Sequence, residues 1–266
     1  MEISNIERMI ITAGRVIHDK EIVFAGTYWP LLVCLFAKSH HAKSAFLVFE
    51  GGYVCDEVPP RLPLLAADSC LAAAASSIGD SFSTLGMILH GGWADVAVLS
   101  SVNLDRFGNI NTTCIGSYQK PKVRMAGTGG GCDLASLAKR LIIVQEHERH
   151  RFPERVDFIT SPGYLSGKGA RFEAGLEEGT GPFKVVTTLG VFGFDGENKE
   201  MVLEGFYENS SIEEMKRSVQ WPLRVSRDVR EVGSPSEEEL DILRNRIDPM
   251  GMFLKGVRYA EGKNSI

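Results

Sequence analysis

A chain of 266 residues with a formal net charge of −5, 44% hydrophobic and 24% charged residues has the composition of an ordinary globular protein. The lack of a basic stripe argues against nucleic acid as a partner, and no apolar run reaches the ~18 residues of a membrane-spanning helix. Five cysteines at irregular spacings and the absence of a signal-peptide pattern predict free thiols and a cytoplasmic location.

The first hundred residues are predicted to alternate between helices and strands. Hydrophobic residues recur at helical spacing over residues 3–17, and the short apolar run at 21–25 is typical of a strand. Pro30 suits the first position of the next helix. The pattern further predicts a helix at 31–38, a strand at 45–50, a proline-rich loop at 54–63, a helix at 82–89 and a strand at 94–99.

The strand at 45–50 ends on a carboxylate, Glu50, which is followed at once by Gly51 and Gly52. In open α/β sheets ligands bind at the carboxyl ends of strands, and glycines allow another backbone or a substrate to approach closely. Glu50 is therefore a candidate nucleophile or base. The same pattern also fits a solvated glutamate before a Gly-Gly turn, and the spacing alone leaves both interpretations open.

Residues 103–111 combine turn chemistry with neighbouring asparagines. Gly108 is available for a positive φ, which predicts a hairpin. Asn109 and Asn111 carry amide groups that can donate hydrogen bonds to a carboxylate or a carbonyl oxygen.

A glycine-rich loop at residues 127–134, with the sequence Gly-Thr-Gly-Gly-Gly-Cys-Asp-Leu, opens a predicted helix. Successive glycine N–H groups before a helix form an anion-binding nest. The loop is not a dinucleotide fingerprint, because a cysteine stands at the third glycine position, and it is not a P-loop, because no Gly-Lys-Ser/Thr follows. The candidate donors are the amides of Gly127, Gly129, Gly130 and Gly131.

The second half of the chain is predicted to contain strands at 141–145, 156–160, 183–188, 190–194 and 200–207, with a glycine-rich surface segment at 165–182. Asp195-Gly196 indicates a hairpin, and helices are predicted to begin at Ser211 and Ser234. His147 and His150 lack the spacing of a zinc motif, so packing or an ion pair is favoured over a metal site. Together the elements predict one domain, residues 1–266, with a three-layer α/β/α fold and a largely parallel open sheet.

Several of these motifs resemble one known family. Phe49-Glu50-Gly51-Gly52 followed by Glu57-Val58-Pro59 resembles the Glu-Ser-Gly…Glu-Val-Pro segment of the β subunit of glutaconate CoA-transferase, a family I CoA-transferase. The similarity extends from about residue 5 to residue 253 and includes Val23-x-x-Gly26-x-x-x-Pro30, the Asp-x-x-Gly-Asn-x-Asn segment at 105–111 and the glycine-rich loop. Two departures are a glycine at position 51 in place of serine and a slightly shorter loop before Glu57.

The resemblance implies the CoA-transferase (NagB/RpiA-like) fold and a role for Glu50 as covalent nucleophile. It further implies that the glycine amides form an oxyanion hole and that Gly26, Gly51 and Asn109 lie near the CoA thioester. Acyl-CoA and coenzyme A would be substrates, without a permanently bound cofactor. A separate α subunit would complete a heteromer, and the alanine-rich segment 64–76 is a candidate contact with it.

Relatives on this scaffold leave alternatives open. Some are hydrolases that open rings or cleave carbon–carbon bonds in CoA esters, and others are decarboxylases of glutaconyl-CoA type that lack the glutamate. The presence of Glu50 favours CoA transfer to a carboxylic or dicarboxylic acid. A third alternative is a non-catalytic scaffold subunit whose partner carries the chemistry.

Overall fold

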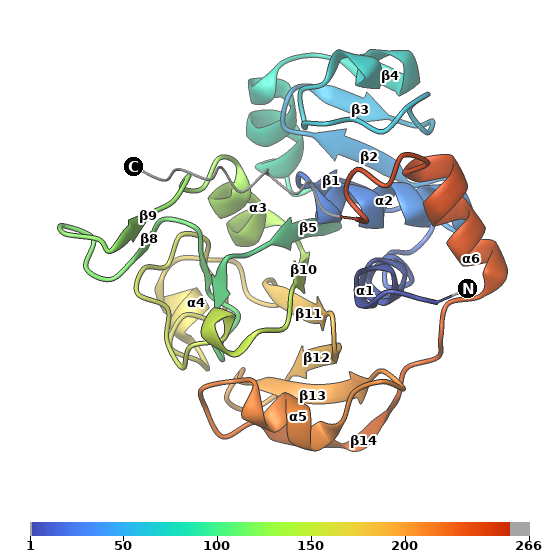
Figure 1. Ribbon diagram of the computed structural model, residues 1–266. Helices are drawn as coiled ribbons and strands as arrows, with labels where there is room; N and C mark the ends of the chain where they lie inside the picture. Colours follow the sequence, from blue (N-terminus) through green and yellow to red (C-terminus); the bar gives the residue numbers. More distant parts are fainter. Residues whose placement is uncertain (1, 256–266) are drawn as a thin grey trace, which may run out of the picture.

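The computed structural model describes residues 2–255, and a ten-stranded sheet in the order β14-β13-β12-β11-β10-β5-β1-β2-β3-β4 runs through it (Figure 1). The five central strands, from β11 to β2, are parallel, and antiparallel strands flank them on both sides. The strands are β1 (Ile22–Ala25), β2 (Phe46–Phe49), β3 (Tyr53–Cys55), β4 (Ala75–Ile78), β5 (Val96–Ser100), β10 (Arg140–Gln145), β11 (Pro182–Thr187), β12 (Gly190–Phe194), β13 (Met201–Phe206) and β14 (Arg224–Glu231).

Both faces of the sheet are buried, which explains why its central strands are apolar throughout rather than alternating with polar residues. In β1, Val23 and Ala25 belong to one hydrophobic cluster and Phe24 to the other. Figure 1 shows α1, α2 and α6 on one side of the sheet and α3 on the other. The predicted three-layer architecture is therefore confirmed.

The first layer consists of α1 (Asn5–Gly14), α2 (Trp29–His40), α6 (Glu237–Asp241) and the π-helical η4 (Ile242–Ile247). The opposite layer contains the π-helical η2 (Phe82–Leu89), α3 (Gly131–Leu137) and α5 (Ile212–Arg217). Shorter helices are η1 (Ser69–Ala74), η3 (Arg149–Arg151) and α4 (Ala170–Glu173). None of the helices between residues 2 and 255 has the length and hydrophobicity needed to span a bilayer.

Two small hairpins lie outside the main sheet. β6 (Asn103–Leu104) pairs with β7 (Ile110–Asn111), and β8 (Cys114–Ile115) pairs with β9 (Val123–Arg124). Gly108, in the first hairpin, has a φ of +74°, so the predicted turn is confirmed.

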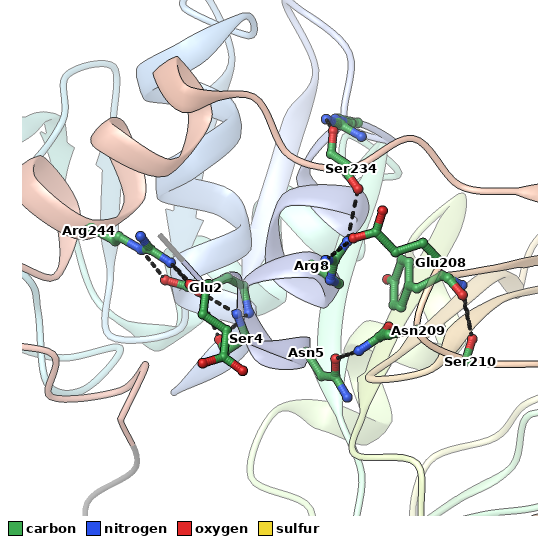
Figure 2. Close-up of polar contacts among 12 residues, drawn as sticks. Glu2, Ser4, Asn5, Arg8, Glu208, Asn209, Ser210, Ser234 and Arg244 are labelled. Carbon is green, nitrogen blue, oxygen red and sulfur yellow. Dashed lines mark hydrogen bonds and ion pairs between the residues drawn. The ribbon is translucent and has the colours of Figure 1, made fainter.

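The first helix is fastened to the last third of the chain (Figure 2). Arg8 of α1 pairs with Glu208 and donates a hydrogen bond to Ser234 Oγ at 3.0 Å. Arg244 donates to the carbonyl of Glu2 at 2.8 Å. These contacts hold the segment that returns from β14 to α6 against the same layer as α1.

The predicted strand at 156–160 is wrong. None of residues 156–160 lies in a strand, and the next residue, Ser161, forms an isolated bridge with Ile110. The Phe158 ring instead stacks on Tyr118, in the loop of the second hairpin, with centroids 5.1 Å apart. Pairing with a neighbouring strand is thus replaced by side-chain packing.

Three strands of the main sheet were not predicted. β3 and β4 lie in segments interpreted as a proline-rich loop and an alanine-rich stretch, and they extend the sheet beyond β2. β14 is a largely exposed strand at the other end of the sheet, and its charged residues, including Arg224, Arg227 and Asp228, hide the usual hydrophobic alternation. The last helix also begins later than predicted, because Ser236 caps it with Glu239 in a reciprocal capping box.

Candidate active site

Three neighbouring parallel strands, β2, β1 and β5, end at the same edge of the sheet. The chain passes from β1 to β2 through α2 on one face and approaches β5 through η2 on the other, so the winding reverses at β1. Ligands in open α/β sheets bind at the carboxyl ends of strands at such a point. Glu50 follows β2, Gly26 follows β1 and Ser100 ends β5.

A cavity of about 400 Å³ opens where these strands end. One wall is formed by the strand ends and the other by the glycine-rich loop before α3. The lining includes Gly26, Glu50, Ala66, Ser100, Thr112, Ser161 and residues 126–131 of the loop.

Glu50 is half-buried at the edge of this cavity. Its Oε2 accepts a hydrogen bond from the Gly130 amide at 3.1 Å, and its backbone carbonyl accepts one from Thr84 Oγ1 at 3.3 Å. Among residues 2–255, no cationic side chain forms an ion pair with it. A carboxylate held by one amide and free of a cation keeps lone pairs available for attack on an electrophile.

The loop before α3 holds its glycines in conformations that favour glycine. Gly127 has a φ of +93° and Gly129 a φ of +50°. Thr112 fastens the loop from outside, because its carbonyl accepts from the Gly127 amide at 2.8 Å and its Oγ1 donates to the Gly127 carbonyl at 2.6 Å. The loop of residues 127–131, called the glycine cradle below, is therefore an ordered turn held by hydrogen bonds.

The four predicted glycine donors have different roles in the structure. The Gly127 amide bonds to Thr112, and the Gly131 amide bonds to the Thr128 carbonyl at 2.9 Å. The Gly130 amide already holds Glu50. Within residues 2–255, the amides of Thr128 and Gly129 have no acceptor, so they are the donors available to a ligand.

Gly51 does not line the cavity; it makes room for a neighbouring segment instead. A Cβ at this position would lie 2.7 Å from the Ala66 carbonyl and 2.8 Å from Ala67 Cα. The alanine-rich segment thus packs directly on the residue after Glu50, and Ala66 lines the cavity. A serine here would require this backbone to move, which is consistent with glycine and a shorter loop occurring together.

Gly26 lines the cavity, but its amide is not a free donor. It bonds to the Val98 carbonyl at 3.0 Å, and a Cβ at position 26 would lie 2.7 Å from that oxygen. Gly26 therefore allows the loop after β1 to pass close to β5.

Asn109 is not among the residues that line the cavity. It is fully buried, its Nδ2 donates to both oxygens of Asp105 and to the Leu165 carbonyl, and its Oδ1 accepts from the amides of Gly163 and Leu165. All its hydrogen-bonding capacity is used in bracing the hairpin against the segment that follows Ser161.

Ala66, Thr128 and Ser161 are among the cavity residues that the sequence patterns did not single out. Thr128 lies within the glycine-rich loop, so its position was a signal for including it. Ser161 follows the wrongly predicted strand, and its Ser-Pro-Gly turn was the only signal available. Neither alanine nor a lone serine carries a chemical motif.

Titratable residues elsewhere have structural roles. His147 is buried between the rings of Phe152 and Phe192, and burial lowers its pKa to about 4. Burial, together with Asp56, raises the pKa of the Cys55 thiol to about 12. Within residues 2–255, no three His, Cys, Asp or Glu side chains are grouped so that they could hold a metal ion.

Comparisons with a family model and with individual proteins indicate the same family. Residues 6–218 match the family model described as Coenzyme A transferase. The chain is 32% identical over 256 residues to the B-type subunit of glutaconate CoA-transferase from Acidaminococcus fermentans, covering 95% of each chain. It is also 32% identical over 238 residues to the B-type subunit of 3-oxoadipate CoA-transferase from Pseudomonas knackmussii, covering 90% of this chain and 91% of that one.

Solved structures agree with this result. The crystal structure of glutaconate coenzyme A-transferase from Acidaminococcus fermentans superposes with a TM-score of 0.89 and 30% identity, covering 95% of this chain and 98% of that one. The decarboxylase AibA/AibB shares the fold with a TM-score of 0.80 at 19% identity, covering 96% and 98% of the two chains. At that identity the likeness concerns the fold alone.

Proposed function

Since this chain belongs to the coenzyme A transferase family, we propose that it is the B-type subunit of a heteromeric CoA-transferase that moves CoA from an acyl-CoA to a carboxylic acid through Glu50. The observation that carries the proposal is the half-buried Glu50 carboxylate held by the Gly130 amide at the edge of a cavity with two free amide donors. Glutaconate and 3-oxoadipate, named in the relatives, are both dicarboxylic, so a dicarboxylic acyl group is the first class to test.

The reaction proceeds in two exchange steps for each substrate. A Glu50 oxygen attacks the thioester carbonyl carbon, the C–S bond breaks and CoA thiolate leaves, which gives a mixed anhydride. The thiolate then attacks the Glu50 carbonyl carbon and releases the acyl group as a carboxylate, leaving a glutamyl-CoA thioester. An acceptor carboxylate reverses these steps and regenerates free Glu50.

The residues around Glu50 supply what this chemistry needs. The Gly130 amide orients the carboxylate, and the amides of Thr128 and Gly129 can bind the oxygen on which negative charge develops. Loss of one such donor costs about 10²–10³ in rate in enzymes that use an oxyanion hole. Partial burial of Glu50 limits hydration, which protects the activated carboxyl from hydrolysis.

The partner is proposed to be an A-type subunit that covers the cavity. Large apolar side chains are exposed on the elements around β4 and η2, with Leu65 63%, Phe82 70% and Met87 61% exposed. Leu85 of the same helix lies 3.5 Å from the Cβ position of Gly130, so this surface adjoins the cradle. Clusters of exposed apolar residues mark protein–protein contacts. The candidate contact therefore includes η2 as well as segment 64–76.

The experiment is a transfer assay with the co-purified complex, supplied with glutaconyl-, glutaryl- or 3-oxoadipyl-CoA and free acetate or dicarboxylate. Ping-pong kinetics predict parallel lines in double-reciprocal plots and a requirement for the acceptor. Rapid loss of thioester to water without acceptor would instead identify a hydrolase, and release of CO₂ a decarboxylase. Retention of full transfer by Glu50→Gln would assign the chemistry to the partner subunit and leave this chain as a scaffold.

A further inference from the structure

Ser161 is a buried residue whose hydroxyl lines the cavity. The residue is 3% exposed, and within residues 2–255 its Oγ has no hydrogen-bond partner. The Ser101 Oγ is also unpartnered but is sealed from solvent, whereas the Ser161 Oγ is not. The hydroxyl therefore opens on the cavity, where a bound molecule can accept a hydrogen bond from it.

The backbone of Ser161 is fixed by its pairing with Ile110. The Ile110 amide donates to the Ser161 carbonyl at 3.0 Å, and the Ser161 amide donates to the Ile110 carbonyl at 3.1 Å. Because both amide and carbonyl are bonded, the backbone position of Ser161 is set by its pairing with β7.

The residues that follow Ser161 are braced from two further directions. Asn109 Oδ1 accepts from the Gly163 amide at 2.9 Å. The Arg171 guanidinium, itself 5% exposed, donates to the Pro162 carbonyl at 3.2 Å and the Gly163 carbonyl at 2.9 Å. The same guanidinium donates to the Ala135 carbonyl near the end of α3 at 3.2 Å. The segment directly after Ser161 and the helix α3 are therefore held by one side chain.

Ser161 faces the first turn of α3, next to the residue that holds Glu50. A Cβ built on Gly131 would lie 3.3 Å from Ser161 Oγ, and one built on Gly130 would lie 2.5 Å from Glu50 Oε2. The hydroxyl and the carboxylate thus lie against neighbouring glycines of the loop and line the same cavity.

The other hydroxyls around the cavity are in different situations. Thr112 Oγ1 donates to the Gly127 carbonyl, and Thr128 Oγ1 accepts from the Cys132 amide. Thr27 is exposed and Ser100 half-buried, so neither has the near-complete burial of Ser161. Among the cavity hydroxyls of the described residues, Ser161 combines near-complete burial, a rigid backbone and the absence of a protein partner.

From this geometry we propose that the Ser161 hydroxyl donates a hydrogen bond to the acyl oxygen of the substrate bound against the glycine cradle. The inference rests on the proposed CoA-transfer function and adds a substrate-binding residue to it. The recognised atom is a thioester carbonyl oxygen in one half-reaction and a carboxylate oxygen in the other. No bond is made or broken at Ser161, which binds and orients the acyl group while Glu50 reacts.

The test compares Ser161→Ala with Ser101→Ala in the assembled enzyme. Ser101 is a matched control, because its hydroxyl is also buried and unpartnered but does not line the cavity. A hydrogen bond to a charged group predicts that Ser161→Ala lowers kcat/KM for the acceptor carboxylate by about 10- to 100-fold. Ser101→Ala is expected to retain wild-type kcat/KM, and Ser161→Cys, a weaker donor, to fall between Ser161→Ala and wild type.

Equal kcat/KM values for Ser161→Ala, Ser101→Ala and wild type would overturn the inference. Should Ser161→Ala fail to fold, Ser161→Cys carries the test, and wild-type kcat/KM in that variant would overturn it as well. Formation of a Glu50–CoA adduct by the wild type reports separately on the proposed function. An adduct together with an unaffected Ser161→Ala rejects only the role of Ser161, whereas no adduct rejects the mechanism itself.

Discussion

The backbone amide of Gly130 donates a hydrogen bond of 3.1 Å to the carboxylate of Glu50, a residue 80 positions earlier in the chain. The contact joins the end of β2 to the N-terminus of α3 across the edge of the sheet. A carboxylate at a helix N-terminus is stabilised by the unpaired amides there. The Gly130 amide that holds the resting carboxylate therefore adjoins the Thr128 and Gly129 amides that would bind the reacting oxygen.

Replacing Gly130 by alanine tests this contact. A Cβ at position 130 would lie 2.5 Å from Glu50 Oε2, so the carboxylate must swing away from the cradle. We expect Gly130→Ala to lower the transfer rate by about 10²-fold or more, since misplacement by an ångström has costs of this size. Gly196→Ala is the control, because nothing lies within 4 Å of a Cβ at that position. Comparable activity in the two variants would contradict the role of the contact.

The exposed surface around η2 is expected to bind the partner subunit. Phe82→Ser removes a side chain that is 70% exposed and should weaken association by at least about tenfold, as replacement of apolar hot-spot residues does. Phe172→Ser, on α4, removes an equally exposed phenylalanine, 68%, away from the proposed contact. Binding constants from titration of the purified partner would show the difference. Equal affinities for the two variants would move the interface elsewhere.

His147 should make the fold sensitive to acid. In the folded protein, burial lowers its pKa to about 4 from 6.5, so the unfolded chain binds a proton more readily over this interval. The contribution of neutral His147 to the free energy of unfolding is therefore fully present above about pH 6.5. It is lost as the pH falls towards 4, which lowers the free energy of unfolding by up to roughly 3 kcal/mol.

His147→Phe should flatten this acid limb of the stability curve while keeping the ring stack with Phe152 and Phe192. His18→Phe, which removes an exposed histidine, is the control. Urea unfolding between pH 4.5 and 7.5 measures the effect. An unchanged slope in His147→Phe would assign the acid sensitivity to other groups.

Arg171→Met is expected to destabilise the fold through lost hydrogen bonds rather than a lost ion pair. The buried guanidinium donates to four backbone carbonyls and to Thr180 Oγ1. Leaving these acceptors unsatisfied should lower the free energy of unfolding by roughly 2–4 kcal/mol. Arg227→Met, at an exposed position of β14, should stay within about 0.5 kcal/mol of wild type in the same urea titration. A small effect at Arg171 would show that water replaces its contacts.

Local patterns predicted the parts of the site that lie next to one another in the sequence. A carboxylate at a strand end and a run of glycines before a helix each carry their own signal, and the structure brings Glu50 and Gly130 together. Ser161 could not be found this way, because its position depends on pairing with Ile110, which is distant in the sequence. The role of Asn109 in the hairpin could not be predicted for the same reason, because its partners at Gly163 and Leu165 are visible only in the folded chain.

The predictions of secondary structure also succeeded where the signal was local and failed where it depended on distant contacts. Central strands such as β5 and β10 were recognisable as apolar runs, since both faces of the sheet are covered. β14 was missed because an exposed edge strand needs no apolar face, and 156–160 was wrongly predicted because Phe158 packs on Tyr118 without a pairing strand. Tertiary context outweighed local propensity in both cases.

The most direct measurement is peptide mass spectrometry of the complex after incubation with acyl-CoA and reduction with borohydride. If Glu50 forms a thioester with CoA, reduction converts its carboxyl group to an alcohol, so activity is lost only when acyl-CoA is present and the mass change maps to residue 50. Full activity after this treatment, or a modification confined to another residue, would contradict a covalent intermediate on Glu50.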